Sequence, residues 1–247
     1  MGRKHPKKKS KFGYYLYAVT VMFLTVVNIS LAIWLLTYVQ SIQVRGTEYS
    51  TKNEIVEWVK EDPMTINSLY TLWKFKSGAY KLPVYLEDVE VKLTAPWSVR
   101  IVVREKEPIG CVLEGNEYHC FDPEGLVLKK TDEYVKDIPI IEGMEVESAK
   151  RFEYLKVKDK QIFSYVVSLT EEMGKSKLQP DRILWQEESM DLFFGDVCVK
   201  LGKSNYEEKL GEISPILEKL DGKKGILHLE HYTKGSTISF EENKEES

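Results

Sequence analysis

Cys198 is the residue of this sequence best suited to covalent chemistry. A cysteine becomes a nucleophile when a neighbouring base depresses the pKa of its thiol. His231 or His119 would supply that base and Arg182 would complete the set, a combination that fits a sortase-like cysteine transpeptidase. The simpler alternative, which we expect, is an inert strand cysteine accompanied by surface histidines. On this interpretation the protein has no catalytic residues.

No other motif of the sequence points to an active site. The chain has no glycine-rich phosphate-binding loop, no Gly-x-Ser-x-Gly segment and no paired-cysteine metal spacing. His228 and His231 are three residues apart, so on a strand they would face opposite sides of the sheet. The sequence therefore predicts a protein without a cofactor, a metal site or a small-molecule substrate.

Cys111 and Cys120 have the spacing of a cross-strand disulfide. Gly115-Asn116 is typical of a two-residue hairpin turn, and this turn places the two cysteines directly opposite each other. Opposed Cα atoms in an antiparallel pair lie within the distance that a disulfide requires. An oxidising compartment would favour the bond. The alternative is two reduced thiols packed on the same face as Ile109 and Leu113.

These candidates belong to a chain organised around one uncharged stretch, residues 14–39. At about 1.5 Å per residue, a helix of this length covers roughly 39 Å and can cross a hydrocarbon core of about 30 Å. The preceding tail, residues 1–13, holds six basic residues and no acid, whereas the remaining 29 basic and 39 acidic residues give −10. Because short basic flanks stay cytoplasmic, we expect a single-pass type II protein of the cell membrane with extracytoplasmic C-terminal domains.

Two further observations bear on this topology and on the kind of partner. A cleaved signal peptide, the alternative to a signal anchor, would have an apolar region of only about 7–15 residues. Its best cleavage site here, Ser30-Leu31-Ala32, lies inside the longer apolar run. The charge of −10 on the remainder argues against a nucleic-acid partner, which needs a basic surface.

Residues 40–108 have the pattern of a small α+β domain. A capping box, Thr51 to Glu54, begins a helix that Asp62-Pro63 stops. The full set of expected elements is a strand at 41–46, helices at about 52–61 and 66–75, and alternating strands at about 89–94 and 98–104. We expect Leu69, Leu72 and Trp73 to share one side of the second helix. The order is therefore β-α-α-β-β.

Residues 109–240 read as a larger mixed β-sheet domain with helices. The expected strands lie at about 109–121 in a hairpin and at 126–128, 182–186, 190–194, 197–201, 226–232 and 237–240. Residues around Pro139 and Gly143 read as a polar linker, and helices are expected at about 159–173 and after a capping box, Ser204 to Glu207. Pro215 should kink or split the second of these helices. The acidic tail, residues 241–247, is expected to be disordered.

The order and spacing of these features resemble the FtsQ/DivIB family of bacterial cell-division proteins. The motifs that carry the resemblance are the span after a basic tail, the Ile42-x-Val44-x-Gly46 segment, the closing Glu105-Lys106-Glu107-Pro108, the Asp122-Pro123-Glu124-Gly125 turn, Val199-Lys200-Leu201-Gly202 before a helix, and the strand at 226–229. The membrane-proximal unit is similar to the family's POTRA (polypeptide-transport-associated) domain. The chain departs from the family at residues 229–232, Leu-Glu-His-Tyr, where an Asp-Leu-Arg-like run is expected.

The resemblance implies a non-catalytic divisome scaffold that acts in septum formation. Members of the family bind the small coiled-coil membrane proteins DivIC (FtsB) and FtsL through the C-terminal part of the β domain. Carried over to this sequence, the partner-binding candidates are Lys209, Glu212, Tyr232, Thr237, Ile238, Ser239 and Phe240. A terminal hairpin tends to leave a sheet edge open to a partner's strand. The alternative function is that of a POTRA-bearing export or surface-assembly factor, because a fold alone does not fix a function.

Overall fold

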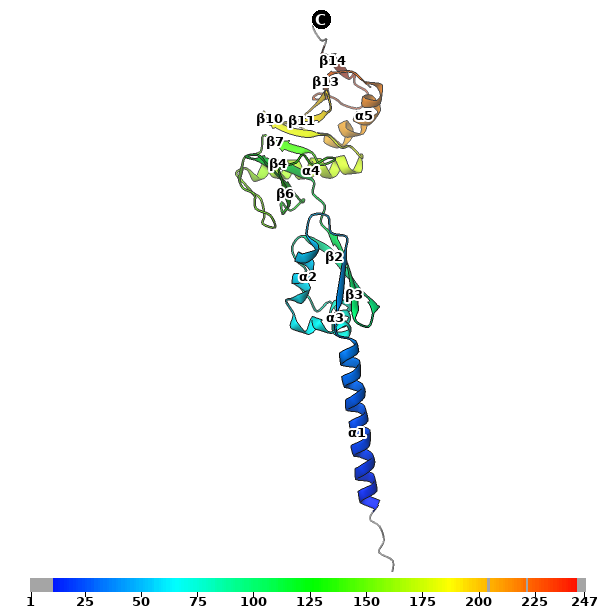
Figure 1. Cartoon of the computed structure of the whole chain (residues 1–247). Coiled ribbons are helices and arrows are strands. Elements are labelled where there is room, and N and C mark those ends of the chain that lie inside the picture. The colour runs from blue at the N-terminus through cyan, green and yellow to red at the C-terminus, as the bar shows by residue number, and fades with distance from the viewer. Residues whose placement is uncertain (1–10, 204, 221, 244–247) are drawn as a thin grey trace, which may run out of the picture. The chain divides into compact units, whose positions relative to one another are not determined.

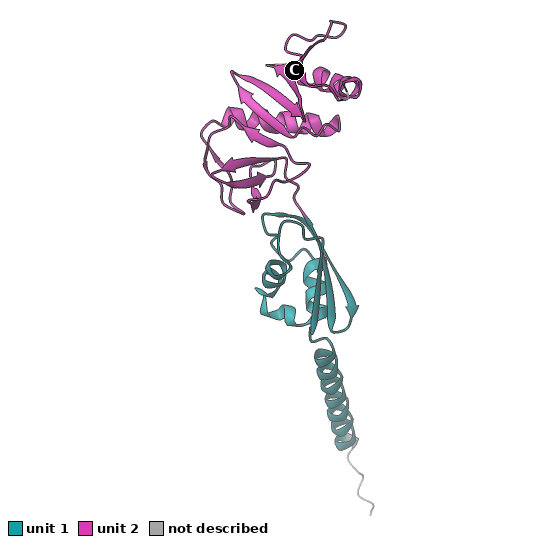
Figure 2. Cartoon of the chain, turned by 45° about the horizontal axis from the view of Figure 1, so that its top comes forward, with its two compact units in different colours: residues 1–104 teal, residues 105–247 magenta. Residues whose placement is uncertain are grey.

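The computed structural model describes residues 11–203, 205–220 and 222–243, which form two compact units, residues 1–104 and 105–247 (Figures 1 and 2). The expected α+β class is confirmed at the level of one apolar N-terminal helix and a large multi-stranded sheet. Most of the predicted basic tail, the capping residue Ser204 and the last four residues of the predicted acidic tail lie outside the described residues.

The apolar helix α1 covers Lys11–Leu36, and its segment Phe12–Leu36 is long and apolar enough to cross a membrane, with a mean hydropathy of 2.3. It ends three residues before the predicted limit at Val39. The reason is pairing with a segment distant in the sequence: the Thr37 carbonyl accepts the backbone N–H of Ser68, and Val39 donates its own N–H to the carbonyl of Ile66. Residues 37–39 therefore belong to the folded unit that follows.

The rest of the first unit contains a three-stranded sheet with helices beside it (Figure 1). Its elements are β1 (Ser41–Arg45), α2 (Lys52–Lys60), the 3-10 helix η1 (Pro63–Ile66), α3 (Ser68–Lys76), β2 (Leu86–Ala95) and β3 (Ser98–Glu105). The strand order is β1-β3-β2, with β1 parallel to β3. The predicted capping box is confirmed, since the side chains of Thr51 and Glu54 each accept the other's backbone N–H.

The side of α3 on which Leu69, Leu72 and Trp73 were expected is not the side that the helix buries. Ser68, Thr71 and Phe75 are its buried residues, whereas Leu69 is 46% and Trp73 is 60% exposed. Ser68 and Thr71 are small enough to let α3 approach its neighbours closely, and their hydroxyls bond to the carbonyls of Pro96, Thr65 and Asn67. Tertiary contacts thus determine which face of α3 is buried, and they leave Leu69 and Trp73 outside the core.

The second unit is built on a nine-stranded sheet within the described residues. Its strands are β4 (Gly110–Glu114), β5 (Glu117–Phe121), β6 (Val127–Thr131), β7 (Ile140–Glu142), β10 (Arg182–Gln186), β11 (Ser189–Phe194), β12 (Val197–Gly202), β13 (Gly225–His228) and β14 (Ser239–Glu242). Their order is β14-β13-β12-β11-β10-β7-β4-β5-β6. A separate two-stranded ribbon pairs β8 (Val146–Ser148) with β9 (Lys156–Val157).

The segment expected to be a polar linker contains β7, which lies in the middle of the large sheet. This strand pairs in parallel with both β4 and β10 and so joins the two halves of the sheet. Gly143 ends it with φ +81°, and a Cβ there would lie 2.0 Å from the carbonyl oxygen of Trp185. Gly143 is therefore required by close backbone approach rather than by linker flexibility.

Helices α4 (Lys160–Lys175) and α5 (Tyr206–Lys219) lie beside the sheet (Figure 1) and pack with it around a single core. Val166 and Leu169 from α4 and Leu210 and Ile213 from α5 are fully buried there. Helix α5 begins after Asn205, which has φ +58° and makes no side-chain capping bond. The helix continues through Pro215 instead of splitting there.

The C-terminal strands differ from their predicted limits. Strand β13 ends at His228, four residues before the predicted end at Tyr232, and β14 begins at Ser239 instead of Thr237. Glu241 and Glu242, predicted to be disordered, are strand residues paired with Ile226 and Gly225. The prediction of disorder for this part of the tail was therefore wrong.

Candidate partner-binding edge of the large sheet

Strand β14 forms one edge of the large sheet. In the part of the chain that the structure describes, it has a neighbouring strand only on its β13 side. The register pairs Phe240 with Leu227 and Ser239 with His228. An uncovered edge strand presents a row of main-chain donors and acceptors to which another strand can pair.

The hydrogen-bond pattern identifies which main-chain groups face outward. Asn243 donates its N–H to the carbonyl of Lys224 at 2.9 Å, and Gly225 donates its own N–H away from β14, to Asp196 on the β12 side at 3.2 Å. In an antiparallel pair the direction of these groups alternates from one residue to the next. The N–H and C=O of Glu241 therefore point toward β13, and those of Phe240 and Glu242 point toward the open edge.

The side chains predicted to contact a partner fall into two groups around this edge. Tyr232, Ile238 and Phe240 are half-buried and pack against the core, whereas Thr237 and Ser239 are exposed. Glu212 on α5 is half-buried and is near enough to the Tyr232 hydroxyl to act on it electrostatically. Partial burial raises the pKa of Tyr232, and the negative charge of Glu212 raises it further.

Lys209 was predicted to contact a partner, but the structure buries it. Its side chain is 2% exposed, and Nζ donates to the carbonyl oxygens of Leu201 at 2.6 Å and of Glu230 at 3.1 Å. The loss of hydration lowers the pKa of the Lys209 ammonium. Lys209 thus links the end of β12 to the turn after β13. Because it is buried, it is not a contact residue for a partner.

The charged residues of the open edge were not among the residues predicted from the sequence, because the prediction for the tail was disorder. Glu242 lies 3.5 Å from Lys223, and Glu241 lies 3.6 Å from His228, whose other ring nitrogen is 3.1 Å from Glu230. The alternation of Ile238 and Phe240 with Ser239 and Glu241 was the available signal, since it extends the strand pattern into the acidic residues. The open edge strand therefore carries two carboxylates, one of which is paired with a lysine.

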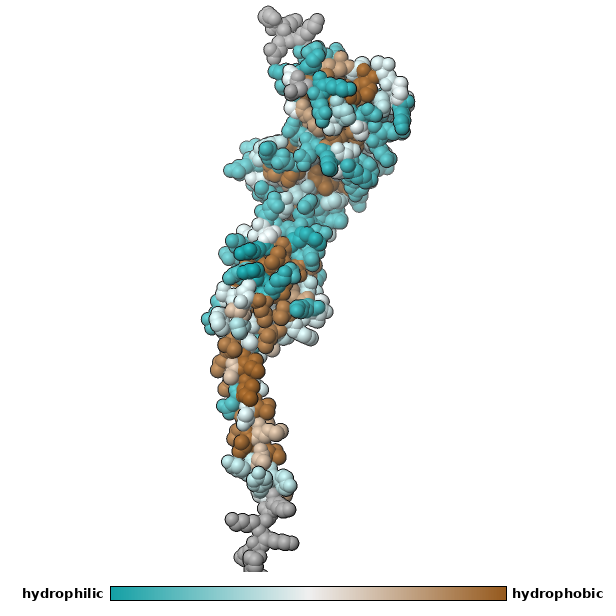
Figure 3. Space-filling view, turned by 90° about the vertical axis from the view of Figure 1, so that its right-hand side faces the viewer, coloured by the Kyte–Doolittle hydropathy of each residue, from teal (hydrophilic) through white to brown (hydrophobic). Residues whose placement is uncertain are grey.

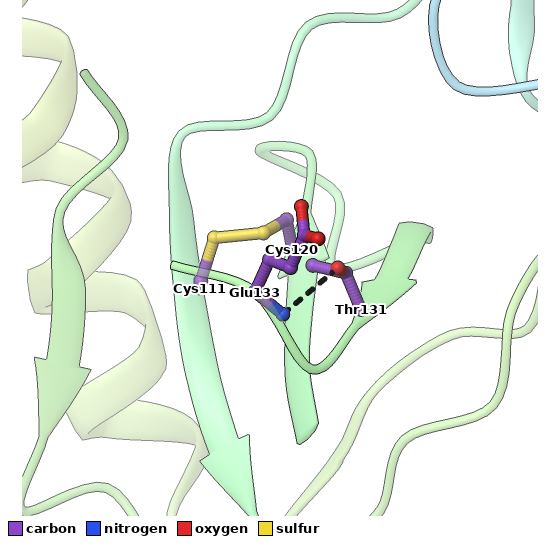
Figure 4. Close-up of a disulfide and its surroundings, with 4 residues drawn as sticks. All are labelled: Cys111, Cys120, Thr131 and Glu133. Atoms are coloured by element: carbon purple, nitrogen blue, oxygen red, sulfur yellow. Dashed lines mark hydrogen bonds between the residues drawn. A yellow bond between two sulfur atoms is a disulfide. The ribbon is translucent and has the colours of Figure 1, made fainter. Parts of the chain in front are cut away.

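At the opposite side of the sheet, β4 and β5 are joined by a disulfide between Cys111 and Cys120 (Figure 4). The predicted register is confirmed, because the two residues are direct partners across the antiparallel pair. Both side chains are buried, at 1% and 0% exposure. The bond lies beside the loop in which Thr131 accepts the backbone N–H of Glu133 at 3.1 Å (Figure 4).

Of the residues of the transpeptidase hypothesis, Arg182 lies in the same row of the sheet as Cys198, two strands away, but His119 does not approach them. His119 lies on β5, five strand positions from Cys198 on β12, which corresponds to about 24 Å at the usual strand spacing. Arg182 is bound to Glu142 at 3.0 Å and stacks over the Phe193 ring at 3.8 Å, while His231 is exposed in the turn after β13. Burial raises the pKa of the Cys198 thiol, which is the opposite of what a nucleophile needs.

Among the described residues, no group of three or more His, Cys, Asp or Glu side chains is placed to hold a metal ion. In comparisons with known proteins, the chain matches no family model and no curated sequence at a significant level. The described residues do contain an apolar N-terminal helix and a large sheet with an open edge strand.

Proposed function

We propose that this protein is a non-catalytic scaffold of the bacterial cell-division machinery that binds small single-span coiled-coil proteins through its second unit. The observation that carries the proposal is the open edge strand β14 at the end of the sheet. It coincides with the region through which the FtsQ/DivIB family, which this sequence resembles, binds its DivIC/FtsB-like and FtsL-like partners.

The proposed binding mode is the addition of a partner strand to β14. The outward N–H and C=O groups of Phe240 and Glu242 would supply main-chain hydrogen bonds, and side chains beside them would give selectivity. Because β14 carries the carboxylates of Glu241 and Glu242, the added strand should carry Lys or Arg opposite them, since opposite charges stabilise cross-strand pairs. The predicted contacts Tyr232, Thr237, Ile238 and Ser239 would border the added strand.

The remaining parts of the chain fit a membrane-bound arm. We propose that α1 is an uncleaved anchor and that residues 40–108 form a POTRA domain, which the element order β1-α2-α3-β2-β3 supports. The six basic residues at positions 1–13 favour a cytoplasmic N-terminus and an extracytoplasmic C-terminal part. In the oxidising compartment that this topology implies, the Cys111–Cys120 bond would persist.

The cellular location of the protein separates this function from its alternative, a POTRA-bearing export or surface-assembly factor. A fusion with a fluorescent protein at the cytoplasmic N-terminus should concentrate at the division site of growing cells. Enrichment that coincides with constriction supports the division scaffold. An even distribution around the membrane of dividing cells would refute it and favour the export factor.

A further inference from the structure

The first unit exposes six large apolar or aromatic side chains near the end of α1. We name this set the membrane-proximal collar; its members are 42% to 60% exposed, and they are Tyr38, Met64, Ile66, Leu69, Trp73 and Trp97. Isolated exposed apolar residues are ordinary in folded proteins, whereas a contiguous group indicates a binding surface. In Figure 3 the apolar surface of α1 continues onto the adjoining part of this unit.

Hydrogen bonds tie the segments that carry the collar to the residues directly after α1. Val39 donates its backbone N–H to Ile66 at 2.7 Å, and Gln40 donates to the carbonyl of Trp97 at 2.9 Å. The side chain of Asn67 donates to the Thr37 hydroxyl at 2.6 Å, directly before the α3 helix that carries Leu69 and Trp73. Leu69 and Trp73 are four residues apart and so lie on one face of that helix.

This connectivity fixes the depth of the collar relative to a membrane that α1 crosses. The 25 residues of Phe12–Leu36 have a helical length of about 37 Å, more than the hydrocarbon core of about 30 Å. The end of α1 therefore reaches the headgroup layer, and residues 37–40 lie in that layer or directly above it. The backbone carbonyls of Ile66 and Trp97 accept hydrogen bonds from Val39 and Gln40, so these two collar residues lie at about the same depth.

The charge of the collar segments also suits a lipid surface. Residues 37–44, 63–78 and 92–99 contain no carboxylate, although the chain has 39 acidic residues. The nearest acid in sequence, Asp62, is engaged by Lys74 at 2.9 Å, by the Tyr70 hydroxyl at 3.0 Å and by the Met64 N–H at 2.9 Å. Its ion pair with Lys74 lowers the pKa of Asp62. Trp and Tyr are the residues enriched at membrane interfaces.

We infer that the membrane-proximal collar lies in the boundary between lipid headgroups and acyl chains, so that the first unit rests on the bilayer. The inference rests on the membrane anchoring proposed above for α1. The bilayer is the occupant because the collar is continuous with the helix that would span it. This placement also explains why α3 buries Ser68 and Thr71 while it exposes Leu69 and Trp73, since the two exposed side chains would face lipid.

Tryptophan quenching by brominated lipids tests this placement. Full-length variants would each retain one of the five tryptophans, with the other four replaced by Phe, and would be reconstituted in phosphatidylcholine–phosphatidylglycerol vesicles without any partner. Trp34 in α1 reports insertion of the span, and Trp58, which packs between Phe75 and Tyr80 outside the collar, is the matched control. Circular dichroism verifies that each variant retains its secondary structure.

The emission of Trp73 and of Trp97 should fall at least about twofold in brominated vesicles, as that of Trp34 should, while Trp58 changes little. Aqueous acrylamide should quench Trp73 and Trp97 less in vesicles than in unfolded protein. If brominated lipid quenched Trp34 alone, the lipid placement of the collar would be wrong, whereas the membrane anchoring of α1 would still hold. This result would indicate that water or a protein partner covers Trp73 and Trp97. If brominated lipid did not quench Trp34, both the membrane anchoring of α1 and the lipid placement of the collar would be wrong.

Discussion

Replacing Glu242 with proline should reduce binding of the partner at least about tenfold while the second unit stays folded. The N–H of Glu242 points to the open edge, so proline removes a donor that only an added strand would use. Proline is tolerated on edge strands where its missing N–H faces solvent, and the preceding residue keeps its extended conformation. Capture of small single-span proteins by the tagged full-length chain from solubilised membranes measures the loss.

Glu242→Ala is the matched control for this substitution. It removes the same carboxylate and the ion pair with Lys223, but it retains the main-chain N–H. Because exposed ion pairs contribute only about 0–1 kcal/mol, we expect Glu242→Ala to bind the partner within severalfold of the original protein. Equal binding by Glu242→Pro and Glu242→Ala would show that the outward N–H is not used.

Replacing Lys209 with methionine should destabilise the second unit by about 2–4 kcal/mol, because two buried carbonyls would each lose a hydrogen-bond donor. The side chain of methionine has a volume close to that of the lysine stem, so the loss should come from the bonds to Leu201 and Glu230. Thermal unfolding of the full-length protein in detergent should show a midpoint lowered by roughly 5–15 °C.

Lys219→Met provides the comparison for this effect, since Lys219 is exposed in the last turn of the same helix. A surface substitution of this kind should change stability by less than about 0.5 kcal/mol. At low temperature, where Lys209→Met remains folded, its partner binding should stay close to that of Lys219→Met. If Lys209→Met instead had normal stability but bound the partner less well, Lys209 would be a direct contact residue.

Features encoded by neighbouring residues were predictable from the sequence. The capping box at Thr51 and Glu54 depends only on residues three positions apart. The hairpin turn at Gly115-Asn116 fixes the register of β4 and β5, and with it the opposition of Cys111 and Cys120. In each case the interaction that stabilises the element closes within about ten residues, so no knowledge of the rest of the fold is needed.

Features that depend on distant segments were not predictable. Strand β7 has only three residues between Pro139 and Gly143, and it exists because β4 and β10 pair with it from both sides. The burial of Lys209 depends on carbonyls at positions 201 and 230, which the sheet brings together. The outward direction of the Glu242 N–H likewise follows from its register with Gly225, which no local pattern specifies.

Amide hydrogen exchange along β14, resolved by residue, tests the central claim that a partner strand adds to this edge. Before binding, the inward amide of Glu241 should exchange more slowly than the outward amides of Phe240 and Glu242. When the co-purified partner is added to the full-length protein, exchange of Phe240 and Glu242 should slow by the largest factor, at least about tenfold. Unchanged exchange at both residues in a complex that has formed would contradict strand addition at β14.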